Sequence, residues 1–355
     1  MDIIKLILCF SLAFGVSLAT TPFVRIIAYK IGAVDIPEER KVHDHPIPRM
    51  GGLAIFYGFL IAVLSFVPVD TQLKGILIGT IIIVSLGIVD DVKQLGAKVK
   101  LAVQIVTAII VVCHGVVIEY ISVPEFINEN GILSLGVFAA PITMLWIVAV
   151  TNAVNLIDGL DGLAVGVSSI ATFSLFFIAI LAGEMQVALI TAALAGGCLG
   201  FLPYNFNPAK IFMGDTGSTF LGYMLSIVCI QGLFKGYVVI SFIIPFLILG
   251  LPLFDTAFAI VRRIWNKKPI MAPDRGHLHH KLIDMGFSQK QTVAILYVIT
   301  SILALSAVVV LEVGAYTAAV FVITVIAFGG FAYKVYSHNH RIHMQKLNEE
   351  KKEEK

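Results

Sequence analysis

The stretch GILIGTIIIVSLGIVDDVKQLGAK, residues 75–98, places two adjacent carboxylates, Asp90 and Asp91, directly after an apolar run. An apolar run of about twenty residues is what an α-helix needs to cross the hydrocarbon core of a bilayer. NLIDGLDGLA (155–164) and FMGDTGS (212–218) repeat this arrangement of acids at the edge of an apolar segment. Five carboxylates therefore lie where hydrophobic segments meet a polar boundary: Asp90, Asp91, Asp158, Asp161 and Asp215.

The composition of the whole chain is that of a protein embedded in a membrane. Of its 355 residues, 58% are hydrophobic and 14% are charged, and the mean hydropathy is +0.93. These values exclude a soluble globular domain. Backbone amides in lipid must be hydrogen-bonded within the segment, and long continuous apolar runs achieve this as helices rather than as the alternating strands of a barrel. The sequence thus predicts an all-α polytopic integral membrane protein.

Apolar segments along the chain predict about eleven transmembrane helices. They lie near residues 3–21, 50–67, 73–89, 99–118, 137–154, 163–182, 187–203, 216–233, 237–260, 292–310 and 315–336. We expect residues 1–336 to form a single transmembrane catalytic domain. Residues 337–355 are expected to be a charged cytoplasmic tail, either disordered or a frayed helix, because they include few apolar side chains.

Lysine and arginine indicate how this helical bundle is oriented. Of the 25 Lys and Arg residues, 22 lie in alternate loops and in the C-terminal tail, whereas the opposite side has only Lys5, Lys74 and Lys235. Because loops rich in these cations stay in the cytoplasm, we expect the N-terminus outside and the C-terminus in the cytoplasm. Every acid motif and the histidine cluster then lie on the cytoplasmic face, whose predicted loops are 22–49, 90–100, 155–162, 203–215 and 259–290.

Polar side chains in the second motif recur at every third position, as Asn152, Asn155, Asp158 and Asp161. If the segment stays helical, they form one polar stripe, which at a membrane boundary indicates a ligand site. The alternative is a glycine-containing turn between two spans. For Asp90 and Asp91 the alternative is a pair of helix-end acids in water, although acids at this end oppose the helix dipole. We favour a metal or phosphate site at Asp90 and Asp91 and a ligand site at the second motif.

FMGDTGS (212–218) precedes a predicted helix, and two interpretations of it stay open. Asp215, Thr216 or Ser218 could cap the helix N-terminus. The same N-terminus favours an anion such as phosphate, and Asp215 could hold Mg²⁺ that bridges phosphate oxygens.

Two predicted cytoplasmic loops combine histidines with cations. RGHLHHKL (275–282) has three histidines between an arginine and a lysine, namely His277, His279 and His280. A zinc site is the alternative, but the neighbouring cations favour an anionic phosphate. The other loop, ERKVHDHPIPRMGG (39–52), has prolines and glycines at positions typical of an ordered loop that returns toward the membrane. Its candidate binding residues are Lys41, His43 and Arg49.

Four motifs together resemble the polyprenyl-phosphate N-acetylhexosamine-1-phosphate transferase family over about residues 20–285. In this order and at these spacings, they are DDVKQLGAK, NAVNLIDGLDGLA, PYNFNPAKIFMGDTGS and HLHH. The resemblance implies a Mg²⁺-dependent enzyme, with Mn²⁺ as the alternative ion. Such an enzyme transfers a sugar 1-phosphate from a UDP-sugar to undecaprenyl phosphate and releases UMP. Its active site would face the cytoplasm from a bacterial plasma membrane. Acids for a metal ion and bases for phosphates are what phosphoryl transfer needs.

The resemblance also implies a role for each matching residue. Asp90 and Asp91 become the pair at the lipid phosphate, one of them a base or nucleophile, and a covalent phospho-enzyme is left open. Lys100 matches a basic residue at the pyrophosphate, and the implied metal ligands are Asp215 and Asn155. The positions implied near the nucleotide and sugar are Asp158, Asp161, Asn205 and Phe212. The implied phosphate-binding histidines are His277, His279 and His280.

The first loop distinguishes branches of that family. VDIPEERKVHDHPIPRMGG (34–52) is similar to the branch that uses UDP-N-acetylglucosamine to initiate teichoic acid, O-antigen or related glycans. The alternative, the muramoyl-pentapeptide branch of peptidoglycan synthesis, has a Lys-rich GTPTMGG-like loop that is missing here. The expected partners are UDP-N-acetylglucosamine, undecaprenyl phosphate and the bilayer, without nucleic acid; a homodimer is left open. A secondary transporter is a remote alternative, because carriers hold their acids near the bilayer midplane.

Overall fold

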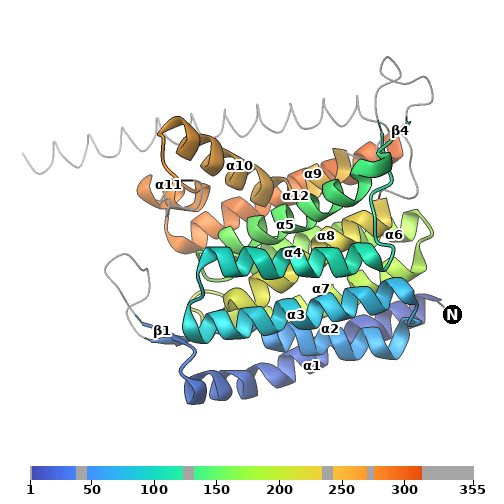
Figure 1. The fold of residues 1–355 in the computed structure, drawn as a ribbon. Coiled ribbons are helices and arrows are strands. Elements are labelled where there is room, and N and C mark those ends of the chain that lie inside the picture. The colour runs from blue at the N-terminus through green and yellow to red at the C-terminus, as the bar shows by residue number, and fades with distance from the viewer. Residues whose placement is uncertain (1, 37–45, 123–131, 234–242, 270–275, 314–355) are drawn as a thin grey trace, which may run out of the picture.

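The computed structural model describes residues 2–36, 46–122, 132–233, 243–269 and 276–313, and helices packed side by side make up most of it (Figure 1). The helices are α1 (Asp2–Ile31), α2 (Gly52–Phe66), α3 (Thr71–Lys93), α4 (Ala97–Cys113), α5 (Ala139–Leu156), α6 (Leu163–Leu181), α7 (Met185–Asn205), α8 (Gly214–Leu233), α9 (Ile243–Ile248), α10 (Gly250–Trp265), α11 (Leu278–Asp284) and α12 (Gln289–Val313). A 3₁₀ turn, Gly136–Phe138, precedes α5.

Two small antiparallel sheets complete the described fold. Strand β1 (Val34–Asp35) pairs with β2 (Ile47–Pro48), and β3 (Tyr120–Ser122) pairs with β4 (Ile132–Ser134). In the described residues, six helices are long and apolar enough to cross a membrane: α1, α3, α5 with its 3₁₀ turn, α6, α7 and α12. The expectation of a helical, multi-pass membrane protein is therefore confirmed. The count of eleven spans and the direction of the termini stay predictions, and the expected span 315–336 lies outside the described residues.

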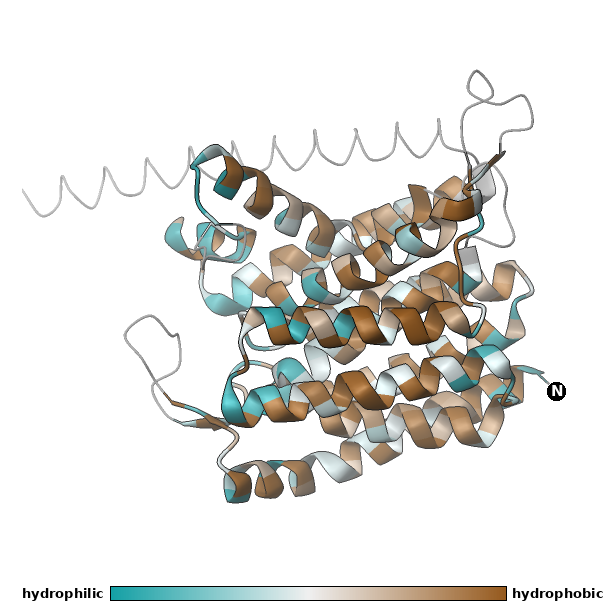
Figure 2. Ribbon diagram, viewed as in Figure 1, coloured by the Kyte–Doolittle hydropathy of each residue, from teal (hydrophilic) through white to brown (hydrophobic). Residues whose placement is uncertain are grey.

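The polar motifs all lie at one end of the bundle. The C-terminal ends of α3, α5 and α7 meet the N-terminal ends of α4, α6 and α8 there, beside β1 and α11, at the left of Figure 1. The N-terminus of the chain and the β3–β4 sheet lie at the opposite end. Figure 2 shows that the sides of the helices are mainly hydrophobic, whereas hydrophilic residues gather at the end that contains the motifs.

Helix α1 continues through Pro22, whereas the sequence predicts an end at residue 21. Proline lacks the N–H that would bond to the carbonyl of Leu18, four residues earlier. The hydroxyl of Tyr204, on α7, donates a hydrogen bond to this carbonyl at 3.3 Å. A neighbouring helix thus satisfies the group that the proline leaves free, and the predicted loop 22–49 starts only after Ile31.

The predicted span 237–260 is also corrected, because its described part forms two helices that are separated at Leu249. Pro252 has no N–H to donate to the carbonyl of Ile248, so the helical ladder is interrupted there. The sequence around these residues is continuously apolar, so it does not indicate the break between the two helices. After this break, helix α10 runs in a new direction and ends at the motif end of the bundle (Figure 1).

Helices α1 and α7 approach closely at two glycines spaced four residues apart. A Cβ at Gly196 would lie 2.3 Å from the carbonyl oxygen of Phe10, and one at Gly200 would lie 2.4 Å from that of Phe14. In a membrane, small residues at this spacing let two helix backbones pack directly against each other. This contact builds one wall of the bundle.

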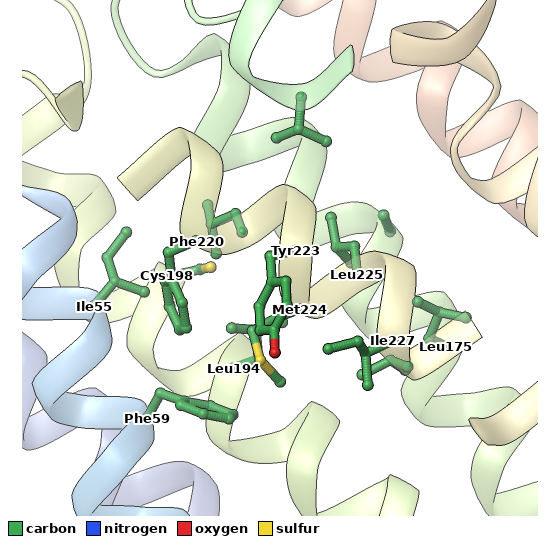
Figure 3. Close-up of a cluster of buried hydrophobic side chains, with 14 of the residues drawn as sticks. Ile55, Phe59, Leu175, Leu194, Cys198, Phe220, Tyr223, Met224, Leu225 and Ile227 are labelled. Carbon is green, nitrogen blue, oxygen red and sulfur yellow. The ribbon is translucent and has the colours of Figure 1, made fainter. Parts of the chain in front are cut away.

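Helix α8 forms the centre of the bundle. Figure 3 shows its buried side chains, among which Phe220 packs edge-on against Phe59 of α2, with ring centroids 5.5 Å apart. The fully buried Tyr223 donates its hydroxyl to the carbonyl of Ile76 on α3 at 3.2 Å. Because α8 is enclosed by other helices, its first turn lies in the middle of the polar end.

Candidate active site

The N-terminus of α8 is capped by Asp91, a buried residue in the last turn of α3. One carboxylate oxygen of Asp91 accepts the backbone N–H of Asp215 at 2.9 Å. The other accepts the backbone N–H of Thr216 at 3.1 Å and its hydroxyl at 2.6 Å. These amides have no partner within their own helix, and a negative charge there favours the helix dipole. The cap therefore comes from a neighbouring helix, and it fixes the position of Asp215.

Gly214 leaves room for the contact between Asp91 and the first turn of α8, and a substitution at Gly214 tests this contact. Gly214 has a φ of +71°, and a Cβ on it would lie 2.4 Å from the Asp91 carboxylate. Gly183 has a φ of +74° with nothing within 4 Å, so it is a matched control. Both alanine variants should lose about 1–2 kcal/mol to the left-handed backbone. In thermal unfolding of the purified protein in detergent, we expect Gly214→Ala to lower the melting temperature more than Gly183→Ala does. Equal shifts would contradict the close contact.

Lys100, from the first turn of α4, joins the other carboxylates of the site. Its ammonium lies 2.9 Å from a carboxylate oxygen of Asp90 and 2.7 Å from one of Asp215. The second oxygen of Asp90 accepts the N–H of Leu95 at 2.6 Å. Adjacent residues on a helix point about 100° apart, so Asp90 faces Lys100 while Asp91 faces α8. The structure thus brings together Asp90, Asp91, Lys100 and Asp215, as expected.

Asn155 lies beside these residues at the end of α5. Its amide donates to the hydroxyl of Ser218 at 2.8 Å and lies close to the carboxylate of Asp215. Helix α5 ends at Leu156, so the predicted polar stripe is wrong beyond Asn155. The other interpretation, a glycine-containing turn, is the correct one for residues 157–162. This turn still belongs to the site.

Asp158 lies on this turn, outside the spanning helices, and has no hydrogen-bond partner for its carboxylate among the described residues. Burial, together with the negative charges of Asp215 and Asp91, raises the pKa of the Asp158 carboxyl to about 8. Arg49 is near enough to oppose this effect. A partly buried carboxylate next to two others is a group that could bind a cation.

Asp161 and Asn205 connect the turn to the loop that follows α7. Asp161 accepts the side-chain amide of Asn207 and the N–H of Ala209, both at 2.9 Å. The buried Asn205 accepts the N–H of Gly162 at 3.1 Å and donates to the carbonyl of Ile211 at 3.0 Å. These bonds position two loops against each other. The substrate contacts expected for Asp161 and Asn205 stay predictions.

Backbone pairing brings the first loop to the same place. The N–H of Phe212 donates to the carbonyl of Pro48 at 2.8 Å, and the carbonyl of Phe212 accepts the N–H of Gly51 at 2.9 Å. Arg49, which lies between these contacts, forms an ion pair with Asp35 of β1. The other two candidates of this loop, Lys41 and His43, lie outside the described residues.

The histidine cluster is held by Asp255, an acid of α10. One oxygen of Asp255 lies 2.9 Å from Nδ1 of His277, and the other accepts the N–H of Leu278 at 2.9 Å. The rings of His277 and His279 are stacked with centroids 5.8 Å apart, and those of His279 and His280 are 4.2 Å apart. The three predicted histidines therefore form one group at the start of α11.

The histidine group lies against the turn that carries Asp158. A Cβ on Gly159 would come within 2.6 Å of Nε2 of His279, so only glycine allows the two segments to touch. Burial, followed by the charges of His280 and His277, lowers the pKa of His279 to about 4. His279 is therefore neutral at physiological pH and can contribute an N–H to a phosphate but no full charge.

Sequence reasoning missed three residues that hold the site together: Asp255, Gln289 and Tyr297. Asp255 was within a predicted span, where an acid is itself a signal of function, and this signal could have found it. Gln289 accepts the side-chain amide of Asn207 at 2.8 Å, and Tyr297 donates to the carbonyl of Gly162. Nothing in the sequence marks these last two, because their partners are far away along the chain.

The site has the ligand chemistry of Mg²⁺, although its carboxylates are not gathered into a preformed cage. Among the described residues there is no group of three His, Cys, Asp or Glu side chains that could hold a metal ion, and Lys100 lies between Asp90 and Asp215. Asp215, Asp158 and Asn155 nevertheless offer only oxygen ligands, which Mg²⁺ prefers. The oxygen donors of these three side chains therefore fit such an ion.

Comparisons with known proteins agree with this geometry. The profile described as glycosyl transferase family 4 matches residues 73–233, which include all five acids. A "probable undecaprenyl-phosphate N-acetylglucosaminyl 1-phosphate transferase" of Bacillus subtilis is 48% identical over 86% of this chain and 85% of its own. A decaprenyl-phosphate N-acetylglucosaminephosphotransferase of Mycolicibacterium smegmatis is 36% identical over 81% and 77%. The undecaprenyl-phosphate alpha-N-acetylglucosaminyl 1-phosphate transferase of Escherichia coli K12 is 27% identical over 79% and 77%. The resemblance seen in the motifs is confirmed, and the chain belongs to glycosyl transferase family 4.

Proposed function

We propose that this protein transfers N-acetylglucosamine 1-phosphate from UDP-N-acetylglucosamine to undecaprenyl phosphate, as the first step of a cell-surface glycan. The names of its relatives support this activity. The observation that carries it is the group of Asp90, Lys100 and Asp215, in which one ammonium contacts two carboxylates. Such a group can bind a phosphate through its ammonium and a divalent cation through its carboxylates. The relatives do not favour the muramoyl-pentapeptide reaction.

The proposed reaction exchanges one phosphoanhydride bond, that of the UDP-sugar, for another, that of the lipid diphosphate. A phosphate oxygen of the lipid attacks the phosphorus that bears the sugar, and a new P–O bond forms. The bond between this phosphorus and the oxygen bridging to UMP breaks, so UMP leaves with the bridging oxygen. The product is a lipid diphosphate that carries the sugar, and neither oxidation nor reduction takes place.

Each residue of the site then has a task. A Mg²⁺ ion held by Asp215, Asp158 and Asn155 would neutralise the charge of the diphosphate. Asp90, whose carboxylate bonds Lys100 and the N–H of Leu95, accepts a proton from the lipid phosphate if it arrives protonated. Lys100 binds the charge that develops on the leaving phosphate. Asp91 is occupied by its three bonds to α8 and acts as a positioning residue rather than as a base.

A cavity between α10, α11 and α12 suits the acceptor lipid. Its volume is about 390 Å³, and its apolar lining is formed by Leu251, Phe254, Phe258, Ile299 and Leu303. Two cationic residues, Arg262 and Lys281, also line it, beside Asp255, which holds His277. An apolar volume with cations at its polar end fits isoprene units joined to a phosphate. The cavity thus leads toward the histidine group.

The cytoplasmic face is the side that this proposal assigns to the site. UDP-sugars are soluble cytoplasmic substrates, and 22 of the 25 lysines and arginines fall on the side of the motifs in the predicted topology. The positive-inside rule therefore supports it. Cysteine labelling of intact and of opened cells at an introduced Asp284→Cys would test this, because Asp284 is exposed at the motif end. Labelling in intact cells by an impermeant reagent would contradict the orientation.

The activity is tested by incubating the purified protein with undecaprenyl phosphate, Mg²⁺ and UDP-N-acetylglucosamine. We expect UMP to be released and EDTA to stop the release. Release of UDP would mean transfer of the sugar without its phosphate, and it would contradict the mechanism. UMP formation only from UDP-N-acetylmuramoyl-pentapeptide would replace the proposed substrate with the other one.

A further inference from the structure

Gly162, the last residue of the turn that carries Asp158, is held from two sides. Its N–H donates to the side-chain oxygen of Asn205 on α7 at 3.1 Å. Its carbonyl accepts the hydroxyl of Tyr297 on α12. The same carbonyl accepts the first helical N–H of α6, from Gly166, at 2.9 Å, so Tyr297 occupies its remaining lone pair. Residues of three helices therefore bond to this one glycine, from α6, α7 and α12.

The contact with Tyr297 requires glycine at two positions at the start of α6, Gly162 and Gly166. Gly162 has a φ of +76°, in the left-handed region that other residues rarely adopt. A Cβ on Gly166 would lie 2.0 Å from the hydroxyl oxygen of Tyr297. The tyrosine thus lies directly on the first turn of α6. Tyr297 is outside residues 73–233, the part of the chain that matches the family profile.

The direction of the Asp158 carboxylate depends on this anchor. Among the described residues no side chain or amide bonds to that carboxylate, so the backbone of the turn alone aims it. The turn begins at the rigid end of α5, where the N–H of Asp158 donates to the carbonyl of Asn155 at 3.2 Å. Its other end is fixed at Asp161 and at Gly162. The hydroxyl of Tyr297 fixes the second of these points.

We propose that Tyr297 is a positioning residue, whose hydroxyl holds the Asp158 turn in the geometry that binds the UDP-sugar. The proposal rests on the proposed function for the identity of the ligand. It assigns no contact between Tyr297 and the substrate. Loss of the hydroxyl should leave the fold intact and let the turn move, because the ring of the tyrosine still packs on α6.

The test compares Tyr297→Phe with Tyr223→Phe, which removes the same atom in the core. The hydroxyl of Tyr223 also donates to a backbone carbonyl, that of Ile76, but in the apolar interior of the bundle. For Tyr297→Phe we expect the KM and the calorimetric Kd for UDP-N-acetylglucosamine to rise about ten-fold, the scale of one lost hydrogen bond. The KM for undecaprenyl phosphate should change less than about two-fold, on the same scale. Tyr223→Phe should lower the melting temperature and leave both constants unchanged.

A second measurement needs no substrate and separates the two proposals. Hydrogen–deuterium exchange should become faster in residues 157–162 of Tyr297→Phe and remain unchanged there in Tyr223→Phe. Unchanged exchange, or an unchanged Kd beside an active wild-type protein, would overturn the role of Tyr297. An equal rise of both KM values would do so as well, because it would indicate a general loss of structure. If the wild-type protein neither binds the nucleotide nor releases UMP, the proposed function fails, and exchange alone then decides on Tyr297.

Discussion

Replacement of Asp91 by alanine is expected to lower both the turnover number and the stability of the protein. The change removes the acceptor of three hydrogen bonds from the first turn of α8. Buried donors left without a partner should cost about 3 kcal/mol in the free energy of unfolding. The first turn then shifts and takes Asp215 with it. A misplacement of about 1 Å is enough to lower turnover about a hundred-fold, which UMP release would measure alongside thermal unfolding.

Asp70→Ala is the matched control for this variant. Asp70 caps α3 at the opposite end of the bundle, where its carboxylate accepts the N–H of Leu73 at 2.7 Å. We expect it to cost about 1 kcal/mol and to leave turnover unchanged. Asp91→Asn keeps one carbonyl acceptor and should be more stable than Asp91→Ala and lose less turnover. An Asp91→Ala protein that is inactive yet as stable as the wild type would show that Asp91 acts in the chemistry and not as a cap.

Asp215→Asn is expected to reduce turnover by about a thousand-fold or more, the scale of losing one main electrostatic contact in a transition state. The carboxylate of Asp215 is contacted by Lys100 at 2.7 Å and lies close to Asn155. An amide in its place can neither balance that ammonium nor hold a divalent cation strongly. The measurements are UMP release and the binding of Mn²⁺ by electron paramagnetic resonance, both with UDP-N-acetylglucosamine present.

Two further variants make the outcome specific. Asp284→Asn makes the same change at an exposed acid at the end of α11, and we expect normal turnover and normal Mn²⁺ binding. Asp90→Asn should lose turnover while it still binds Mn²⁺, because Asp90 is assigned to the lipid phosphate. Full activity of Asp215→Asn would remove this residue from the site. Loss of activity with unchanged Mn²⁺ binding would place the ion elsewhere.

The sequence could predict those parts of the site that depend on short-range patterns. The acid motifs and the histidines were found because polar groups at the edge of an apolar segment are rare and costly, whereas Lys100 followed from the resemblance of the motifs to a known family. That these segments meet at one end of the bundle followed from the alternation of cations between loops. The hydrogen-bond partners of these residues could not be predicted from the sequence, since the cap from Asp91 to α8 joins residues more than a hundred positions apart.

Helix ends were predicted less well, for a physical reason. A proline usually ends a helix in water, yet at Pro22 the hydroxyl of Tyr204 takes over the freed carbonyl, and no local pattern announces this. At Leu249 the opposite occurs, because an unbroken apolar run conceals two helices. Tyr297 illustrates the same limit within the site: a single tyrosine in an apolar helix has no signature until its partner, Gly162, is known.

The position of Lys100 has a consequence for the order in which ligands bind. In the resting protein its ammonium serves as an internal counter-ion for Asp90 and Asp215. A divalent ion at Asp215 would compete with this ammonium, so a lone ion would bind weakly. A diphosphate bound beside it would give the ammonium a new anion, and the carboxylate would then be free to bind the ion. Ion and nucleotide should consequently bind cooperatively, each increasing the affinity for the other by the same factor.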